Sequence, residues 1–235
     1  MPDVTVILPT FNERDNITLL IEGILDNVKP SPEVLVVDDN SPDGTWQIVS
    51  ELAAAHPTIR LIRRIDERGL TSAISRGIQE AQGNVVVWMD TDLSMPPEKI
   101  PDLLAALDGN DLAIGSRYLA GGRDIGHSFL AKAFSVTINF FAGLFLGFSV
   151  TDYTSGFLAV RKEVFDRIDL TGDYGEYCID LLYRARKLGY RLKEVPYDCV
   201  ERHAGESKTA TNLLGFFSRG SKYVTTILRL RFSRI

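Results

Sequence analysis

Short apolar runs alternate with longer amphipathic stretches through the first half of the chain. The apolar runs are rich in β-branched residues and end at turn-forming or acidic residues; they span Val4–Leu8, Glu33–Val37, Ile59–Ile62, Asn84–Met89 and Leu112–Ile114. Runs of this length and composition predict strands, and a continuous apolar run predicts a strand that is buried on both faces.

The stretches between these runs place apolar residues three or four positions apart, as an amphipathic helix does. They predict helices over Ile17–Leu25, Trp46–Ala53, Gly69–Ala81 and Pro97–Leu107. Because strand and helix alternate and the loops are short, the strands can be joined by right-handed crossovers. The first half is therefore predicted to be an α/β, Rossmann-like, doubly wound and mostly parallel sheet.

Acidic residues follow three of the predicted strands. Glu13 comes after the first strand, Asp39 after the second, and Asp90 and Asp92 after the fourth. The carboxyl ends of parallel strands share one edge of a sheet, so these side chains can converge on one ligand. Two carboxylates at i and i+2 can share a divalent cation that also holds phosphate oxygens. A metal and diphosphate site at Asp90 and Asp92 is predicted; an acidic loop that caps the next helix is the alternative.

The usual nucleotide-binding signatures are absent from the sequence. No G-x-G-x-x-G follows a strand and no G-x-x-x-x-G-K-[ST] occurs, which argues against dinucleotide and P-loop binding. Carboxylates on the ribose and base, with a metal ion on the phosphates, would be a different way to bind a nucleoside diphosphate.

The second half continues with a turn and strand over Asp152–Arg161, a helix that carries Tyr177–Ala185, and a strand over Arg191–Val195. A polar loop follows, Glu201–Lys208. Its two cations, Arg202 and Lys208, could grip a phosphate as the loop folds over it. A solvated surface loop is the alternative.

Composition is that of one ordinary globular domain, with 235 residues, 45% hydrophobic and 24% charged. Two cysteines, Cys178 and Cys199, provide no disulfide framework, which favours a reducing compartment. The first residues lack a basic segment and a long apolar run, so we expect a first strand there and no signal peptide. We expect residues 1–211 to form the main domain.

The stretch from Phe129 to Val150 is unusually apolar. No charged residue occurs between Ala133 and Thr151, a length close to a membrane span, although polar residues and glycines interrupt it. We expect one or two helices that lie in a membrane interface. A helix in the protein core and a true membrane span are the alternatives.

The tail, residues 212–235, predicts a basic amphipathic helix. Net charge is −5 overall, yet no acidic residue follows Glu206, while lysines and arginines continue to Arg234. An acidic body with a basic tail argues against nucleic-acid binding and fits a tail that faces an anionic membrane surface. A helix that packs on the domain has the same pattern.

Several segments together resemble a known family. They are Pro9–Glu13, Val37–Thr45, Asp90–Leu93, Gly115–Tyr118, Ser155–Phe157, and Glu201–Arg202 with Gly205–Lys208. The chain resembles the inverting family-2 glycosyltransferases with the GT-A fold, and among them the dolichol-phosphate (polyprenol-phosphate) mannose synthases. Phe11 departs from the usual tyrosine, Ser94 from a frequent glutamine, and Thr71 from a common glycine; none of these is a metal ligand.

The resemblance implies a role for each matching residue. The nucleoside would be held by Pro9, Phe11, Glu13, Val37 and Asp39; the metal and diphosphate by Asp90, Thr91 and Asp92; and phosphates of donor or acceptor by Arg117, Arg202 and Lys208. The groups implied in catalysis are Asp92, Arg117, Arg202 and Lys208.

The resemblance also implies an activity. A hexose, with mannose from GDP-mannose as the first expectation, would be transferred to a dolichyl or polyprenyl phosphate with inversion at the anomeric carbon. The reaction would take place at the cytoplasmic membrane face, with Mg²⁺ or Mn²⁺ as cofactor. The protein would be peripheral to the membrane, with an anchoring subunit as a possible partner. Alternatives are a UDP-glucose-dependent glucosyltransferase, a transferase that extends a glycan, and a catalytically silent nucleotide-sugar-binding module. If a general base were needed, Glu176 and Asp180 are the nearby candidates.

Overall fold

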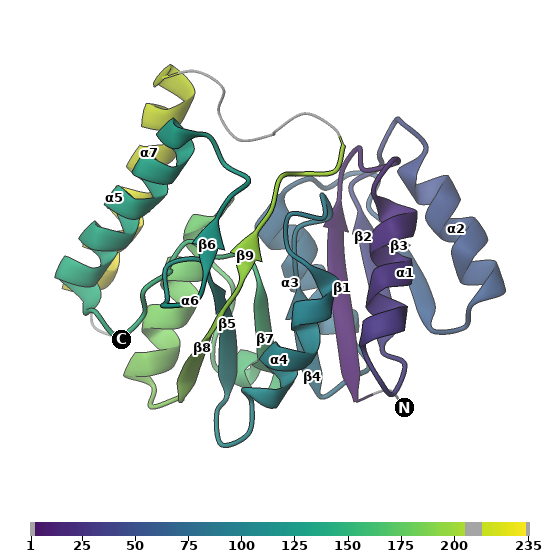
Figure 1. Cartoon of the computed structure of the whole chain (residues 1–235), viewed down its shortest axis with the longest axis horizontal. Coiled ribbons are helices and arrows are strands. Elements are labelled where there is room, and N and C mark those ends of the chain that lie inside the picture. The colour runs from purple at the N-terminus through teal and green to yellow at the C-terminus, as the bar shows by residue number, and fades with distance from the viewer. Residues whose placement is uncertain (1–2, 205–212, 234–235) are drawn as a thin grey trace.

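The computed structural model describes residues 3–204 and 213–233. Its centre is a seven-stranded sheet with the order β3-β2-β1-β4-β7-β5-β8 (Figure 1). The strands are β1 (Val4–Thr10), β2 (Glu33–Asp38), β3 (Ile59–Arg63), β4 (Val85–Trp88), β5 (Leu112–Ser116), β7 (Leu158–Arg161) and β8 (Leu192–Pro196). The predicted α/β fold and its strands are confirmed.

One strand runs against the others. β7 pairs antiparallel with both β4 and β5, whereas all other neighbours in this sheet are parallel. The periodicity predicted a strand here but did not place it between β4 and β5. Because β7 separates them, the ends of β4 and β5 are held apart, which leaves room for a second set of side chains at the edge of the sheet.

Alternate residues of the strands serve the two faces of the sheet, as a buried strand requires. Val6 and Leu8 pack with helices α1 (Ile17–Asn27), α2 (Thr45–Ala55) and α4 (Ile100–Ala105). Ile7 packs on the opposite face with α3 (Leu70–Glu80). The helix predicted over Pro97–Leu107 begins as a 3₁₀ turn, Pro97–Lys99, before α4.

Two long helices lie side by side at the end of the molecule opposite α2 (Figure 1). They are α5 (Phe129–Leu146) and α7 (Leu213–Phe232), and both pack near α6 (Glu176–Lys187). A small parallel pair, β6 (Arg123–Asp124) with β9 (Asp198–Cys199), connects this end to the sheet. The sequence pattern had not predicted this pair, because two residues carry no periodicity.

Helix α5 is apolar on both sides but buried on only one. Ile138 and Ala142 lie in the core, whereas Phe140 is 58% exposed and Leu144 57%. Within the described residues it is the one helix long and apolar enough to cross a membrane, and 28% of it is buried. It is therefore not a helix of the protein interior, and its position in a membrane interface stays a prediction.

Helix α7 is docked on the domain along one face. Tyr223, Ile227 and Leu230 are buried in the core. Lys222 Nζ lies 2.8 Å from Asp173 Oδ2, and Arg229 Nη2 lies 2.7 Å from Asp180 Oδ1. Basic side chains that the tail was expected to present to a membrane thus also tie the helix to the protein, while apolar side chains remain exposed at Val224, Leu228 and Phe232.

Candidate functional site

Two cavities adjoin at the carboxyl ends of the strands. The first, which we call the strand-end pocket, has a volume of about 370 Å³. The second, the helical pocket, has about 170 Å³ and is bounded partly by α5 and α7. Asp90, Leu70 and Tyr174 line both cavities, so Asp90 stands at their junction.

Most of the residues predicted from the sequence line the strand-end pocket. They are Pro9, Phe11, Glu13, Asp39, Asp90, Thr91, Asp92 and Arg202. The predicted convergence of carboxylates from three strand ends is therefore seen in the structure. Lys208 lies outside the described residues. Val37 is fully buried in β2 and supports the pocket from within the sheet, so its contact with a nucleoside stays a prediction.

The Asp90–Ser94 turn fixes the two central carboxylates. Asp92 Oδ1 accepts a hydrogen bond of 3.0 Å from the backbone N–H of Ser94, and Leu93 between them has a left-handed φ of 64°. A branched residue in that region is strained, which is a common feature of binding sites. Asp92 Oδ2 lies 2.8 Å from Nη2 of Arg202. The Asp90 carboxylate accepts no hydrogen bond within the described part of the chain.

Asp90 is reachable from solvent through the pockets, yet protein surrounds it on most sides. Desolvation raises the pKa of Asp90 to about 6, with repulsion from Asp92 as the next cause and a smaller contribution from Glu13; His127 and Arg202 oppose the rise. Clustered carboxylates that lack enough positive charge are stabilised by a cation, and carboxylate oxygens are the ligands that Mg²⁺ and Mn²⁺ prefer. Asp90 and Asp92 therefore fit a divalent cation.

Asp39 is held at the far side of the strand-end pocket by a buried arginine. Arg64 Nε donates to Asp39 Oδ1 at 2.7 Å, and the backbone N–H of Gly69 donates to Oδ2 at 2.9 Å. Arg64 is 6% exposed and was not foreseen from the sequence, where nothing distinguishes it from its neighbours. At the pocket mouth Arg68 stacks on the ring of Phe11, with its guanidinium carbon 4.4 Å from the ring centroid.

The segment after β9 crosses over the acidic turn. The backbone N–H of Val200 donates to the carbonyl of Ser94, and that of His203 to the carbonyl of Asp92, both at 3.0 Å. These bonds bring Arg202 to Asp92, and the expected grip of the loop on a phosphate stays a prediction. The rest of that loop, from residue 205, lies outside the described residues.

The helical pocket is built around an arginine that already has a partner. Arg117 donates to Asp152 from both Nε and Nη2 at 2.8 Å, and both residues are almost fully buried. Burial by itself would raise the pKa of Asp152, but Arg117 outweighs it and holds that pKa below its ordinary value. Nη2 of Arg117 also reaches Thr154 at 2.8 Å and Ser135 at 3.4 Å. Asp152 was not foreseen as part of the site.

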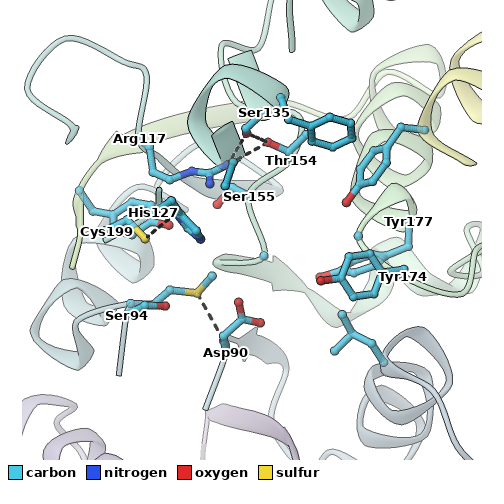
Figure 2. A pocket seen from close by; sticks show the side chains of 18 residues that line it. Asp90, Ser94, Arg117, His127, Ser135, Thr154, Ser155, Tyr174, Tyr177 and Cys199 are labelled. Carbon is cyan, nitrogen blue, oxygen red and sulfur yellow. Dashed lines mark hydrogen bonds between the residues drawn. The ribbon is translucent and has the colours of Figure 1, made fainter. Parts of the chain in front are cut away.

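A second cation, His127, lies on the same side of the helical pocket, facing Asp90 across it (Figure 2). Its Nδ1 is 2.9 Å from Asp124 Oδ1 and 3.8 Å from Sγ of Cys199. The hydrogen bond to Asp124 is the main cause that raises the pKa of His127 to about 10, so the imidazole is protonated at neutral pH. No motif pointed to His127 or Asp124, since they meet Cys199 only through the β6–β9 pairing.

The two acids considered as general bases are elsewhere. Glu176 is buried and accepts from the backbone N–H of Asp173 at 3.0 Å, and Asp180 is paired with Arg184 and Arg229. Neither lines either pocket.

Comparison with known protein families agrees with the fold and the site. Residues 5–169 match the family model of Glycosyl transferase family 2. This match covers more than half of the chain, which therefore belongs to glycosyl transferase family 2, a family of enzymes that transfer sugars. The resemblance that the sequence motifs indicated is confirmed at this level.

Curated relatives are similar over most of the chain. It is 41% identical over 211 residues to the polyprenol monophosphomannose synthase of Mycolicibacterium smegmatis, covering 86% of this chain and 79% of that protein. Identity is 37% over 219 residues to the undecaprenyl-phosphate mannosyltransferase of Micrococcus luteus, covering 90% and 89%. With the dolichol-phosphate mannosyltransferase of Pyrococcus furiosus it is 40% over 210 residues, covering 87% of this chain but only 58% of that longer protein.

Solved structures share the fold at lower identity. Glucosyl-3-phosphoglycerate synthase from Mycobacterium tuberculosis, crystallised with Mn²⁺, UDP and glucosyl-3-phosphoglycerate, aligns with a TM-score of 0.72 and 20% identity, covering 100% of this chain and 81% of that one. The same enzyme was also crystallised with Mg²⁺ and UDP. This likeness shows the GT-A fold.

Proposed function

We propose that this protein is an inverting hexosyltransferase that moves mannose from GDP-mannose to a polyprenyl or dolichyl phosphate at the cytoplasmic face of a membrane. One observation carries the proposal: Asp90 lines both cavities, so a donor diphosphate in the strand-end pocket and an acceptor in the helical pocket would meet at one carboxylate. The names of the curated relatives, which are mannosyltransferases of polyprenol-type phosphates, support the same reaction.

The strand-end pocket suits the nucleotide sugar. Phe11 and Arg68 offer flat surfaces for a base, and Asp39 is held rigidly enough to accept hydrogen bonds from it. Asp90 and Asp92 would hold Mg²⁺ or Mn²⁺, as the metal ions in the solved neighbours support. Such an ion neutralises negative charge on the departing diphosphate. Arg202, beside Asp92, would contact the same phosphates.

The reaction needs no strong general base if the acceptor is a phosphate monoester. Its second pKa is about 6, so the phosphate is largely a dianion near neutral pH. One of its oxygens forms the bond to the anomeric carbon while the bond from that carbon to the diphosphate oxygen breaks, and the nucleoside diphosphate leaves with the electron pair. The burial of Glu176 and the ion pairs of Asp180 are consistent with a site that lacks a base.

A lipid acceptor would enter beside α5 and α7. Phe134 and Ser135 of α5 and Tyr223 of α7 line the helical pocket, while the outer surface of α5 exposes Phe140 and Leu144. Exposed aromatic and aliphatic side chains on a helix favour the membrane interface. The polyprenyl chain would follow this surface into the bilayer, with the protein peripheral to it. A separate membrane-anchoring subunit is compatible with this arrangement.

The test is a donor and acceptor panel with the purified full chain. GDP-mannose, UDP-glucose and GDP-glucose are each incubated with undecaprenyl phosphate in phosphatidylglycerol vesicles and Mn²⁺, and lipid-linked sugar is measured by mass spectrometry. We expect product from GDP-mannose, its loss with EDTA, and its return with excess Mn²⁺ or Mg²⁺.

Other outcomes would contradict the proposal in distinct ways. Product from UDP-glucose alone would identify a glucosyltransferase. Metal-dependent binding of a nucleotide sugar without product from any pair would identify a catalytically silent binding module. Undecaprenol, which lacks the phosphate, is the matched acceptor control and should give no product.

A further inference from the structure

We infer that His127, held by Asp124, is the cation that binds the acceptor phosphate in the helical pocket. The inference rests on the proposed function for the identity of the acceptor and goes beyond it by assigning the phosphate-binding group. The expectation that Arg117 contacts a phosphate of the donor or acceptor stays a prediction beside it.

Positive charge at the helical pocket comes from two side chains in the described part of the chain. Among the described residues that line the helical pocket, Arg117 and His127 are the basic ones, and Asp90 is the acid opposite them. A phosphate dianion in this cavity would be repelled by the donor diphosphate proposed to lie beside Asp90, so a cation on the other side of the cavity is needed to hold the phosphate in place.

Most of the hydrogen-bonding capacity of Arg117 is already used within the protein. Its Nε and Nη2 both donate to Asp152, and Nη1 lies 3.6 Å from Asp124. A buried arginine that is already paired in this bidentate way has those donors occupied, and releasing them would leave Asp152 buried and unpaired. Arg117 therefore shapes the wall of the pocket and orients Ser135 and Thr154.

His127 has the complementary arrangement. Asp124 engages Nδ1 only, and Nε2, on the other side of the ring, has no hydrogen-bond partner within the described residues. The ring faces the cavity opposite Asp90 (Figure 2). A protonated imidazole with one nitrogen anchored by a carboxylate presents its second N–H in a fixed direction, which suits a charge-assisted hydrogen bond to a phosphate oxygen.

Asp124 is a positioning residue in this arrangement. Its side chain is only 4% exposed, and its backbone is fixed by the β6–β9 pairing. Asp124, His127 and Cys199 also have the side-chain types of a metal site, with ligand atoms within 4.8 Å of one another. The separation of 2.9 Å between Nδ1 and Oδ1 is that of a hydrogen bond, and Arg117 beside Asp124 disfavours a further cation there.

Direct binding is tested by NMR of the ¹⁵N-histidine-labelled wild type, which contains three histidines. Farnesyl phosphate should shift the Nε2 resonance of His127, and farnesol should not. Inorganic phosphate should produce a smaller shift of the same resonance if the headgroup alone is recognised. An Nε2 resonance that ignores farnesyl phosphate at saturation would overturn the inference, whether or not sugar transfer occurs.

Kinetics provide the second measurement. We expect His127→Gln to raise the KM for farnesyl phosphate by about tenfold or more, because a charge-assisted hydrogen bond is lost, while the KM for the sugar donor stays the same. Asp124→Asn should raise the acceptor KM less, and His127→Lys should recover part of the loss by restoring the charge. His56→Gln, at an exposed histidine after α2, is the matched control.

The two proposals fail in different ways. If the wild type transfers no sugar to any lipid phosphate, the proposed function is wrong, and the NMR titration still decides whether His127 binds a phosphate monoester. If transfer occurs and His127→Gln leaves the acceptor KM unchanged, the proposed function stands and the role of His127 is wrong.

Discussion

The two pockets that meet at Asp90 differ in how they hold charge. In the strand-end pocket, Asp90 and Asp92 lie close together, and the pKa of Asp90 is raised to about 6. In the helical pocket, each cation is paired with its own carboxylate, Arg117 with Asp152 and His127 with Asp124. One side therefore attracts a metal ion, and the other holds its cations in fixed positions by ion pairs.

This difference matches what each substrate would bring. A donor diphosphate needs a cation that accompanies it, and excess negative charge at the strand ends provides the place for that ion. The proposed acceptor phosphate would have to be held near other anions, which a cationic donor in a fixed position can do. The comparison predicts that changes on the two sides have effects of different kinds.

The largest effect is expected from Asp92→Asn. Loss of one of the two proposed metal-ligating carboxylates should lower kcat by about 100-fold or more, because charge on the leaving diphosphate would no longer be neutralised. Sugar transfer is measured at saturating Mn²⁺. Asp102→Asn, at a surface carboxylate of α4 paired with Lys99, is the matched control and should be silent. Full activity of the Asp92 variant would remove the metal site from the proposal.

The strand-end pocket could be predicted from the sequence because its residues obey a local rule. Each acid follows an apolar run, and parallel strands bring their carboxyl ends to one edge, so Glu13, Asp39, Asp90 and Asp92 could be placed together without knowing any loop. The hydrophobic pattern also predicted the order of strands and helices along the first half. It could not place β7 between β4 and β5, since strand order depends on long-range pairing.

Arg117 and the Ser155–Phe157 motif of the helical pocket were recognised in the sequence, but other residues that set its charge escaped prediction for the same reason. Asp124, His127 and Cys199 meet through a strand pair of two residues each, which has no detectable pattern. Asp152 was predicted at the start of a turn and lies there, but its buried pairing with Arg117 was not foreseen. A single histidine or acid forms no recognisable motif in the sequence, and only folding brings these residues together at the wall of the helical pocket.

The next largest effect is expected on stability, from Asp152→Asn. Removing the carboxylate leaves the guanidinium of Arg117 buried without its partner, which should lower the free energy of unfolding by about 3 kcal/mol. Urea unfolding measures it. Asp198→Asn breaks an exposed arginine–aspartate pair with Arg123, which solvent screens, and should lower the free energy of unfolding far less. Equal losses in the two variants would show that the Arg117 pair has no special place in the pocket.

The smallest effect is expected at the outer surface of α5. Leu144→Ser removes an exposed leucine from the face proposed to contact the bilayer and should weaken sedimentation with phosphatidylglycerol vesicles by roughly tenfold. Leu19→Ser, at an exposed leucine of α1 far from that face, should sediment like the wild type. If both variants lose sedimentation equally, or if neither loses it, the apolar face of α5 is not the surface that binds the membrane.

Tyr223 closes the helical pocket from α7, an element near the end of the chain. During synthesis the strand ends are complete long before this helix leaves the ribosome, and domains begin to fold from the N-terminus. The strand-end pocket can thus form while the helical pocket still lacks one wall. The ion pairs of Lys222 and Arg229 hold α7 against the domain, so the wall of the helical pocket is complete only once this helix has docked.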